Sequence, residues 1–351
     1  MKKDVLEGVS PEAKEKMTKN LVYVGIIGVV MLFMGLSSAY YVSMGDSFWV
    51  KFPLPSAFWI STIVILVGSF LFVLAIRDMK KGHTLRAKYL VLATTLSGIV
   101  FGITQYIGYS QLVDKGAYLV SNILVSNGRY GDYYELKMDG ALLVVDGNNF
   151  KKKGELLSSS EMESLKLFAN HFTSSDSAQQ LTIDNYGTKF NLIYRSEPLA
   201  IVDGRLIHSN GEELTRVDWI RLNDMMKHIA AGRGDFFLKG QVGKDFKLYY
   251  HGEEVKYDNR ELYYQGKRLS KGLELKLIDS RDNATSYLYI MTILHLLHVI
   301  FMIIYMILFT RRTFNNEFNS ENTLGMRATA IFWHFLGALW LYLLLFLLFI
   351  H

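Results

Sequence analysis

The chain has 351 residues, of which 50% are hydrophobic and 14% aromatic, and its formal net charge is +5 at pH 7. This composition is too apolar for an ordinary soluble protein and too polar for one that lies wholly inside a membrane. The chain has no cysteine, which excludes disulfides, thiolate metal sites and cysteine nucleophiles. We therefore expect a protein that is part membrane-embedded and part globular.

Residues 1–20 carry many charges and are too long a lead-in for a cleaved signal peptide, so they predict a cytoplasmic tail. Residues 21–112 should hold transmembrane helices 1–3, and residues 285–351 should hold helices 4 and 5. The apolar stretches that could cross about 30 Å of hydrocarbon are 21–44, 56–76, 89–112, 285–310 and 328–350. Residues 113–284 are polar and rich in turn residues, which predicts a domain in water.

The positions of the cations predict the orientation. Thirteen of the fourteen lysines and arginines outside residues 113–284 lie in the tail, in residues 77–88 or in residues 311–327, and Lys51 is the exception. The positive-inside rule then makes these parts cytoplasmic and places residues 113–284 and the carboxyl terminus on the periplasmic side. Residues 113–284 hold 24 cations and 25 anions, so the net positive charge reports topology and indicates no nucleic-acid partner.

Residues 113–284 contain three segments that align with one another, beginning at Gly131, Gly187 and Gly243, at intervals of 56 residues. In each segment an aromatic residue and a leucine alternate as in a strand, and a glycine turn follows. A repeat of this length cannot bury its own apolar face, so we expect the repeats to stack into one α+β domain. The alternative is that the glycines mark unrelated turns.

A helix is expected to close each repeat. The hydroxyl residues Ser158, Thr215 and Ser270 stand where N-caps belong, and residues 160–163 and 215–218 fit the pattern of capping boxes. Apolar residues follow the first two caps at helical spacing: Leu165, Phe168 and Phe172, then Trp219, Leu222 and Met226.

His295 and His298 lie three residues apart in the fourth predicted helix, and His334 lies in the fifth. The pair could reach a single metal from one helical face. Neighbouring residues on one helix cannot, however, ligate one haem from opposite sides. A membrane haem or quinol-binding protein that uses His295, His298 and His334 is therefore the alternative hypothesis, and packed bundle histidines are the preferred one.

No Asp or Glu lies inside the five predicted spans, so the acids on which proton relays depend are missing from them. The polar residues that remain suit hydrogen bonds between helices: Ser37, Ser38, Ser61, Thr62, Ser69, Thr94, Thr95, Gln105, His295, His298 and His334. Small residues at close-approach spacing also favour helix packing: Gly25, Gly28, Gly35, Ser38 and Ala39 in the first span, and Gly98 and Gly102 in the third.

The last two spans resemble subunit III of the haem-copper oxidases, the cytochrome c oxidase type in particular. HLLHVI, from His295, is similar to the family's HGLHVI, and WHF from Trp333 with Trp340 is similar to its WHFVDVVWLFLY. Arg312 and Gly325 match between these motifs. Residues 31–35 and Gln105 with Tyr109 resemble the family's MFFAG and QxxEY motifs more loosely. Val29, Gly108 and Gly337 stand where the family has acids.

The resemblance implies a membrane all-α fold, a five-helix bundle of the bacterial type, into which the periplasmic α+β domain of three repeats is inserted. It implies a non-catalytic subunit of an aerobic terminal oxidase in the bacterial inner membrane, which stabilises the catalytic subunit and supports proton uptake. No cofactor is expected on this chain, because haem and copper belong to partner subunits I and II. Arg312, His298, Trp333 and His334 would contact phospholipid, and His295, His298, Trp333, His334, Trp340 and Gln105 would form the bundle motif.

The inserted domain has no counterpart in short members of that family, and we expect it to dock a neighbouring respiratory protein, such as cytochrome c or a donor complex in a supercomplex. Its near-neutral charge favours docking over long-range steering. A receptor with a sensing domain ranks last, because the predicted cytoplasmic loops are too short for an output module.

Overall fold

The computed structural model describes residues 11–45, 47–124, 128–173, 181–235, 240, 242–318 and 323–350. The chain forms two compact units, one of helices and one that contains the strands. We call the first the helical bundle (up to Asp46, Lys51–Leu119 and from Asn283 onward) and the second the insertion domain (Ser47–Val50 and Val120–Asp282). The predictions for residues 1–10, for part of the loop at 311–327 and for His351 lie outside the described residues.

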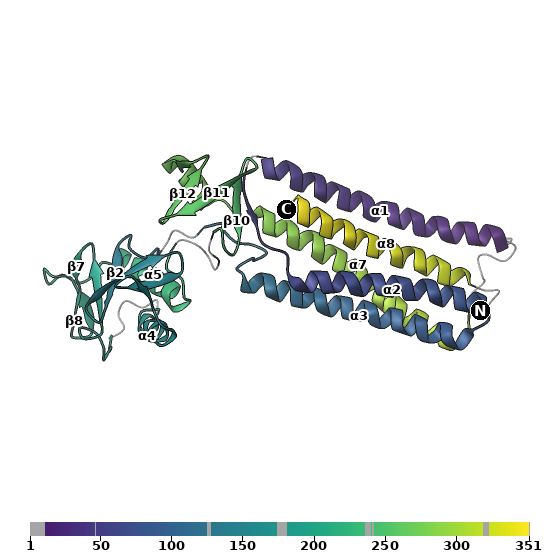
Figure 1. Ribbon diagram of the computed structural model, residues 1–351, viewed down its shortest axis with the longest axis horizontal. Coiled ribbons are helices and arrows are strands. Elements are labelled where there is room, and N and C mark those ends of the chain that lie inside the picture. The colour runs from purple at the N-terminus through teal and green to yellow at the C-terminus, as the bar shows by residue number, and fades with distance from the viewer. Residues whose placement is uncertain are drawn as a thin grey trace. The chain divides into compact units, whose positions relative to one another are not determined.

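Within the described residues, the helical bundle contains five helices that are long and apolar enough to cross a membrane (Figure 1). They are α1 (Pro11–Gly45), α2 (Ser56–Lys80), α3 (Thr84–Asp114), α7 (Asn283–Phe314) and α8 (Leu324–Phe349). The helices α1, α2, α3 and α7 run beyond the apolar stretches that predicted them, whereas α8 begins four residues before its predicted stretch and ends one residue before the end of that stretch, and α1 begins within the expected tail. The multi-pass membrane assignment and the mostly helical fold class are thereby supported.

The helices α2, α3, α7 and α8 share a common core, and α1 packs on α7 and α8. The contact face of α1 is narrow, with Phe33, Ser37 and Tyr40 buried in its apolar part. Nothing lies within 4 Å of a Cβ placed at Gly25 or Gly28. The small residues of the first span therefore do not serve packing inside this chain as the sequence suggested.

The insertion domain repeats one order of elements, four strands and then a helix, in each of the three aligned segments. The first has β2 (Tyr134–Met138), β3 (Ala141–Asp146), β4 (Asn149–Lys152), β5 (Glu155–Leu156) and α4 (Ser159–Asn170). The second has β6 (Phe190–Tyr194), β7 (Glu197–Pro198), β8 (Ala200–Val202), β9 (Arg205–Ile207) and α5 (Arg216–Ala230). The third has β10 (Lys247–Tyr250), β11 (Glu253–Asp258), β12 (Glu261–Tyr264), β13 (Lys267–Arg268) and α6 (Lys271–Asp279).

The strands do not form three equal sheets. The first two segments share a sheet in the order β5-β4-β3-β2-β6-β7, with β8 and β9 as a separate hairpin. Strand β2 pairs antiparallel with β6, so that Leu136 lies opposite Leu192. The third segment forms its own sheet, β1-β10-β11-β12-β13, in which β1 (Phe48–Lys51) comes from the connection between α1 and α2. The sequence did not predict this strand.

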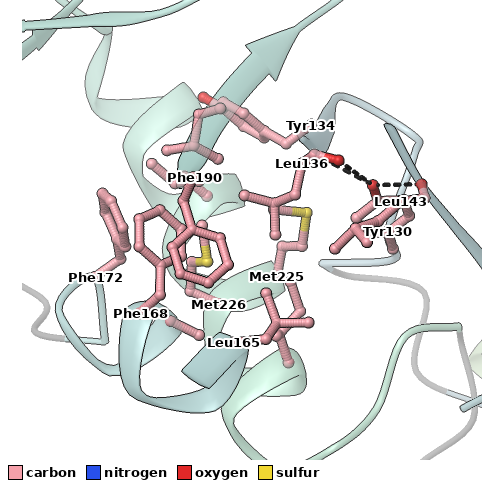
Figure 2. Packing of buried hydrophobic residues seen from close by; sticks show 14 of the residues in the cluster. Tyr130, Tyr134, Leu136, Leu143, Leu165, Phe168, Phe172, Phe190, Met225 and Met226 are labelled. Carbon is pink, nitrogen blue, oxygen red and sulfur yellow. Dashed lines mark hydrogen bonds between the residues drawn. The ribbon is translucent and has the colours of Figure 1, made fainter. Parts of the chain in front are cut away.

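One hydrophobic core lies under the shared sheet (Figure 2). Residues at alternating strand positions, such as Leu136 and Phe190, meet α4 and α5, and the Phe168 and Phe190 rings stack with centroids 4.4 Å apart. Every apolar residue predicted to face inward from α4 and α5 is buried there. The buried Tyr130 hydroxyl donates to the Leu143 carbonyl oxygen at 2.8 Å, so its polar atom is satisfied.

Hydroxyl side chains begin all three helices of the insertion domain, as the sequence predicted. Ser158, Thr215 and Ser270 are the N-caps of α4, α5 and α6, and each side chain accepts a backbone N–H three residues on. The capping box of α4 joins Ser158 to Glu161, two residues before the predicted pair. Each such cap stabilises its helix by about 1 kcal/mol.

A buried acid joins the third segment to the rest of the insertion domain. The side chain of Asp235 is fully buried, forms ion pairs with Arg129 Nε at 2.8 Å and Arg260 Nε at 3.4 Å, and accepts a hydrogen bond from the Tyr257 hydroxyl at 2.5 Å. Burial raises the pKa of Tyr257, and the hydrogen bond to Asp235 raises it further, so this phenol remains the donor. Arg129 precedes the first segment while Tyr257 and Arg260 belong to the third, so the cluster links distant parts of the chain.

Candidate functional site: the polar layer of the helical bundle

His295 lies at the centre of an aromatic layer in the helical bundle. Its ring centroid is 5.6 Å from that of Trp340 on α8 and 5.9 Å from that of Phe101 on α3. Phe58 on α2 meets Trp340 edge to face with centroids 5.4 Å apart. Four helices therefore contribute one ring each, and His295 itself is 1% exposed.

Hydrogen bonds between helices cross the same layer. The Trp340 indole Nε1 donates to Thr62 Oγ1 at 2.9 Å, and Gln105 Nε2 donates to Ser61 Oγ at 2.8 Å. His295 Nε2 lies 3.0 Å from the carbonyl oxygen of Leu336 on α8. Because a carbonyl only accepts, Nε2 carries the proton and Nδ1 is left as an acceptor. We call these five side chains, His295, Trp340, Thr62, Gln105 and Ser61, the polar layer.

Glycines allow the large rings to lie close to neighbouring backbones. Trp333 is 1% exposed and packs where a Cβ at Gly98 would come within 2.9 Å of its ring. A Cβ at Gly108 would come within 2.4 Å of the Phe58 ring, far inside contact distance. The absence of a side chain at Gly108 therefore leaves the space that Phe58 fills. Position 337 differs, since a Cβ there would meet Ser69 and Ile65 at 3.5 Å or more.

The structure separates the remaining predicted site residues. The half-buried His298 donates from Nδ1 to the Leu294 carbonyl oxygen of its own helix at 2.7 Å, and its ring lies 6.1 Å from that of Phe33 on α1. His334 is half-buried with its ring centroid 6.4 Å from that of Phe72. Arg312, near the end of α7, donates from Nε to Glu317 at 2.6 Å. Only His295, Trp340 and Gln105 of the predicted bundle motif meet in one layer.

The polar layer can hold helices together and accept hydrogen bonds. Each imidazole of α7 has one nitrogen engaged by a backbone carbonyl, which is the pattern of a packed histidine. Among the described residues no three His, Asp or Glu side chains gather as a set of metal ligands. Gln105 Oε1 and His295 Nδ1 are buried acceptors with no partner in the described part of the chain.

The sequence did not reveal the partners of these residues. Ser61 and Thr62 were expected to form hydrogen bonds, but their pairing with Gln105 and Trp340 depends on how α2, α3 and α8 face one another. Phe58 and Phe101 read as ordinary apolar residues of their spans. A glycine at position 108, opposite an aromatic residue, is the one feature that could have indicated a close approach.

Residues 278–351 match the family model for cytochrome c oxidase subunit III. The matched residues contain all of α7 and α8, the two helices whose motifs carry the resemblance, together with His295, Trp333 and Trp340. No curated protein and no solved structure matches the chain.

Proposed function

From the match of residues 278–351 to the family model for cytochrome c oxidase subunit III, we propose that this chain is the non-catalytic subunit III of a bacterial terminal haem-copper oxidase. The observation that carries the proposal is the coincidence of the family match with the layer that holds His295 between Trp340, Phe101 and the Leu336 carbonyl oxygen. Haem and copper belong to subunits I and II, and this chain supports their turnover and proton uptake without taking part in electron transfer.

The orientation follows from the positive-inside rule. The amino terminus and the connections α2–α3 and α7–α8 face the cytoplasm, and the insertion domain faces the periplasm. The periplasmic position of the insertion domain supports a docking role for it, because electron donors reach an oxidase of this type from the periplasmic side. The neighbour that it contacts is another respiratory protein.

The catalytic subunit packs on α1. This helix is the least covered of the five, since only 11% of the residues in its most apolar part are buried within the chain. Its glycines Gly25 and Gly28 have open space around them. Small residues let a partner helix approach closely in hydrocarbon, where packing and hydrogen bonds drive association. Gly28→Leu would then weaken recovery of the catalytic subunit. Gly337→Ala, at a position inside the bundle with ordinary contacts, is the control.

Phospholipid binding is assigned to Arg312, His298 and His334, while Trp333, also expected at this site, is 1% exposed and packs inside the bundle. Arg312 is half exposed, and its present partner Glu317 is a surface carboxylate that a lipid phosphate can replace as a charge-assisted acceptor. Arg312→Gln should reduce the phospholipid retained by the purified protein, as counted by lipid mass spectrometry. Arg311→Gln, the exposed neighbour on the same turn, should retain it; equal loss from both variants would reduce Arg312 to a general anchoring charge.

The whole proposal is tested by tagging the chain, purifying it in mild detergent from aerobically grown cells and identifying what co-purifies by mass spectrometry. Recovery of haem-copper subunits I and II in stoichiometric amounts is expected. Recovery of the chain alone with a Soret absorption band would instead favour the haem-protein alternative and overturn the proposal.

A further inference from the structure

A cleft of about 450 Å³ lies in the insertion domain between α5 and the loop that precedes β2. Tyr133 and Arg221 line it, together with Val217 and Ile220 from the outward face of α5. Val217 is 55% exposed and Ile220 50% exposed, so two branched aliphatic side chains stand at its edge. Arginine and tyrosine are among the residues enriched at protein interfaces and their hot spots.

Two arginines flank the Tyr133 ring. The guanidinium of Arg221 lies 4.0 Å from the ring centroid and that of Arg195 lies 5.6 Å from it. Arg221 is also fixed by Asp218 at 3.2 Å, an acid that anchors the start of α5. The Tyr133 ring and the Arg221 guanidinium are thus held in place before any partner arrives, which lowers the entropy lost on binding.

Two further arginines belong to the same surface: Arg195, which contacts the cleft residue Tyr133, and Arg216, which directly precedes the cleft residue Val217. Arg195 and Ser196 both have positive φ, 46° and 74°, in the turn between β6 and β7, where Asn and Gly are the preferred residues. Arg216 is the first residue of α5, where the helix dipole disfavours a cation. In the described part of the chain neither arginine has an ion-pair partner.

We propose that this surface, defined by Tyr133, Arg195, Arg216, Val217, Ile220 and Arg221, is the docking site of the insertion domain for an acidic protein segment that places an aliphatic side chain in the cleft. The inference deepens the docking role given above and rests on it. The guanidiniums of Arg195 and Arg216 would pair with carboxylates of the partner, while Val217 and Ile220 would cover its aliphatic side chain.

Charge argues against the other occupants. A second copy of the chain, joined through a twofold axis, would bring the same cations against each other. A lipid surface would bring phosphates against Asp132 and Asp224, which also line the cleft, whereas a protein can offer N–H donors to those carboxylates. The near-neutral total charge of the domain agrees with contact over a short range and with little long-range steering.

The test is site-specific photo-crosslinking of the full chain in native membranes. A photoreactive phenylalanine analogue replaces Val217, and in the control it replaces Leu275, an aliphatic residue on α6 that is 62% exposed. We expect the Val217 probe to crosslink to a peptide rich in Asp and Glu from a different polypeptide, with little product from the control. A crosslink to lipid, to another copy of the chain or to a basic peptide, or no crosslink at all, would overturn the proposal.

A second variant separates charge from folding. Arg216→Glu puts an acid at the start of α5, where it favours the helix, so the domain should remain folded. We expect it to lower the Val217 crosslink yield about fivefold, the effect of reversing one exposed charge pair. Lys271→Glu, at the matching first position of α6, should leave the yield unchanged. If both variants retain full yield, the charged contact is refuted. Co-purification of the catalytic subunit is measured on the same membranes. If the catalytic subunit is recovered but the crosslink fails, only the docking proposal is wrong; if the catalytic subunit is not recovered, the oxidase assignment is wrong.

Discussion

The helical bundle and the insertion domain bury polar groups in opposite ways. In the predicted spans of the bundle the buried polar side chains are uncharged, and many hydroxyls bond to the carbonyl oxygen four residues back, as Thr62 does to Phe58 and Thr292 to Leu288. In the insertion domain the fully buried Asp235 forms ion pairs with two arginines. Hydrocarbon penalises every unmatched polar group, whereas a domain in water can bury an ion when several donors surround it.

This difference separates the roles of the two parts. The bundle uses weak, neutral hydrogen bonds and ring packing to fix its helices. Removing any one of these contacts should therefore lower its stability only a little. The insertion domain depends on one charged cluster to join its third segment to the other two. Mutations should therefore have unequal effects in the two regions.

The largest effect is expected from Asp235→Ala. The change leaves the guanidinium of Arg129 without its buried carboxylate partner and should destabilise the insertion domain by about 3–5 kcal/mol. Hydrogen exchange of the full chain, read by mass spectrometry, should show lost protection in β11 and β12 and unchanged protection in α7 and α8. Asp184→Ala, at an exposed position, is the control; equal exchange in both variants would contradict the linking role of Asp235.

A smaller loss is expected from Gly108→Ala in the helical bundle. The added Cβ overlaps the Phe58 ring at 2.4 Å and should cost about 1–3 kcal/mol through overpacking. Gly337→Ala meets ordinary contacts at 3.5 Å and should be neutral or slightly stabilising. Thermal unfolding of the two purified variants in the same detergent measures the difference, and a Gly108 variant as stable as the Gly337 variant would show that Phe58 moves aside freely.

The polar layer should show a modest coupling. A double-mutant cycle with Trp340→Phe and Thr62→Val removes the indole hydrogen bond from each side in turn. The expected coupling is about 0.6 kcal/mol, the typical worth of a hydrogen bond between membrane helices. Unfolding of the wild-type chain, the two single variants and the double variant in mixed detergent, followed by circular dichroism of the backbone, gives the four free energies of unfolding. A coupling near zero would mean that ring packing alone holds the layer.

The smallest effect is a pH dependence in α4. The hydrogen bond from Lys152, with those from Ser158, lowers the pKa of Glu161 from 4.5 to about 2. The contribution of the ionised Glu161 to the stability of the insertion domain is therefore fully present above pH 4.5 and is lost as the pH falls through about 2. Hydrogen exchange in the first turn of α4 should rise in the wild-type chain over that window, and Glu161→Gln should remove this dependence. An unchanged profile in the variant would assign the titration to another group.

The sequence was most informative where one physical rule decides the outcome. Apolar length predicted the five helices, and hydroxyl residues before apolar periodicity predicted the caps Ser158, Thr215 and Ser270. The order of strands and helices in the aligned segments agrees with the threefold pattern, while the equivalence of the three segments stays a prediction. Strand β1 escaped notice, because four residues between two membrane helices carry no periodicity and pair only with a distant strand.

The candidate site was less accessible to sequence analysis. The motifs identified His295, Trp333 and Trp340, and the family match includes all three residues. Which residues meet His295 depends on the rotation of α3 and α8, so Phe101 and Leu336 could not be named beforehand. Position 108 shows the same limit, since the reason for glycine there is a ring on another helix.

The most direct test of the account is a density map of the complex purified through a tag on this chain. The account predicts a haem-copper catalytic subunit against the helical bundle, with His295 turned toward the Leu336 carbonyl oxygen and all iron and copper held by other polypeptides. Iron or copper coordinated by His295, His298 or His334 would contradict it.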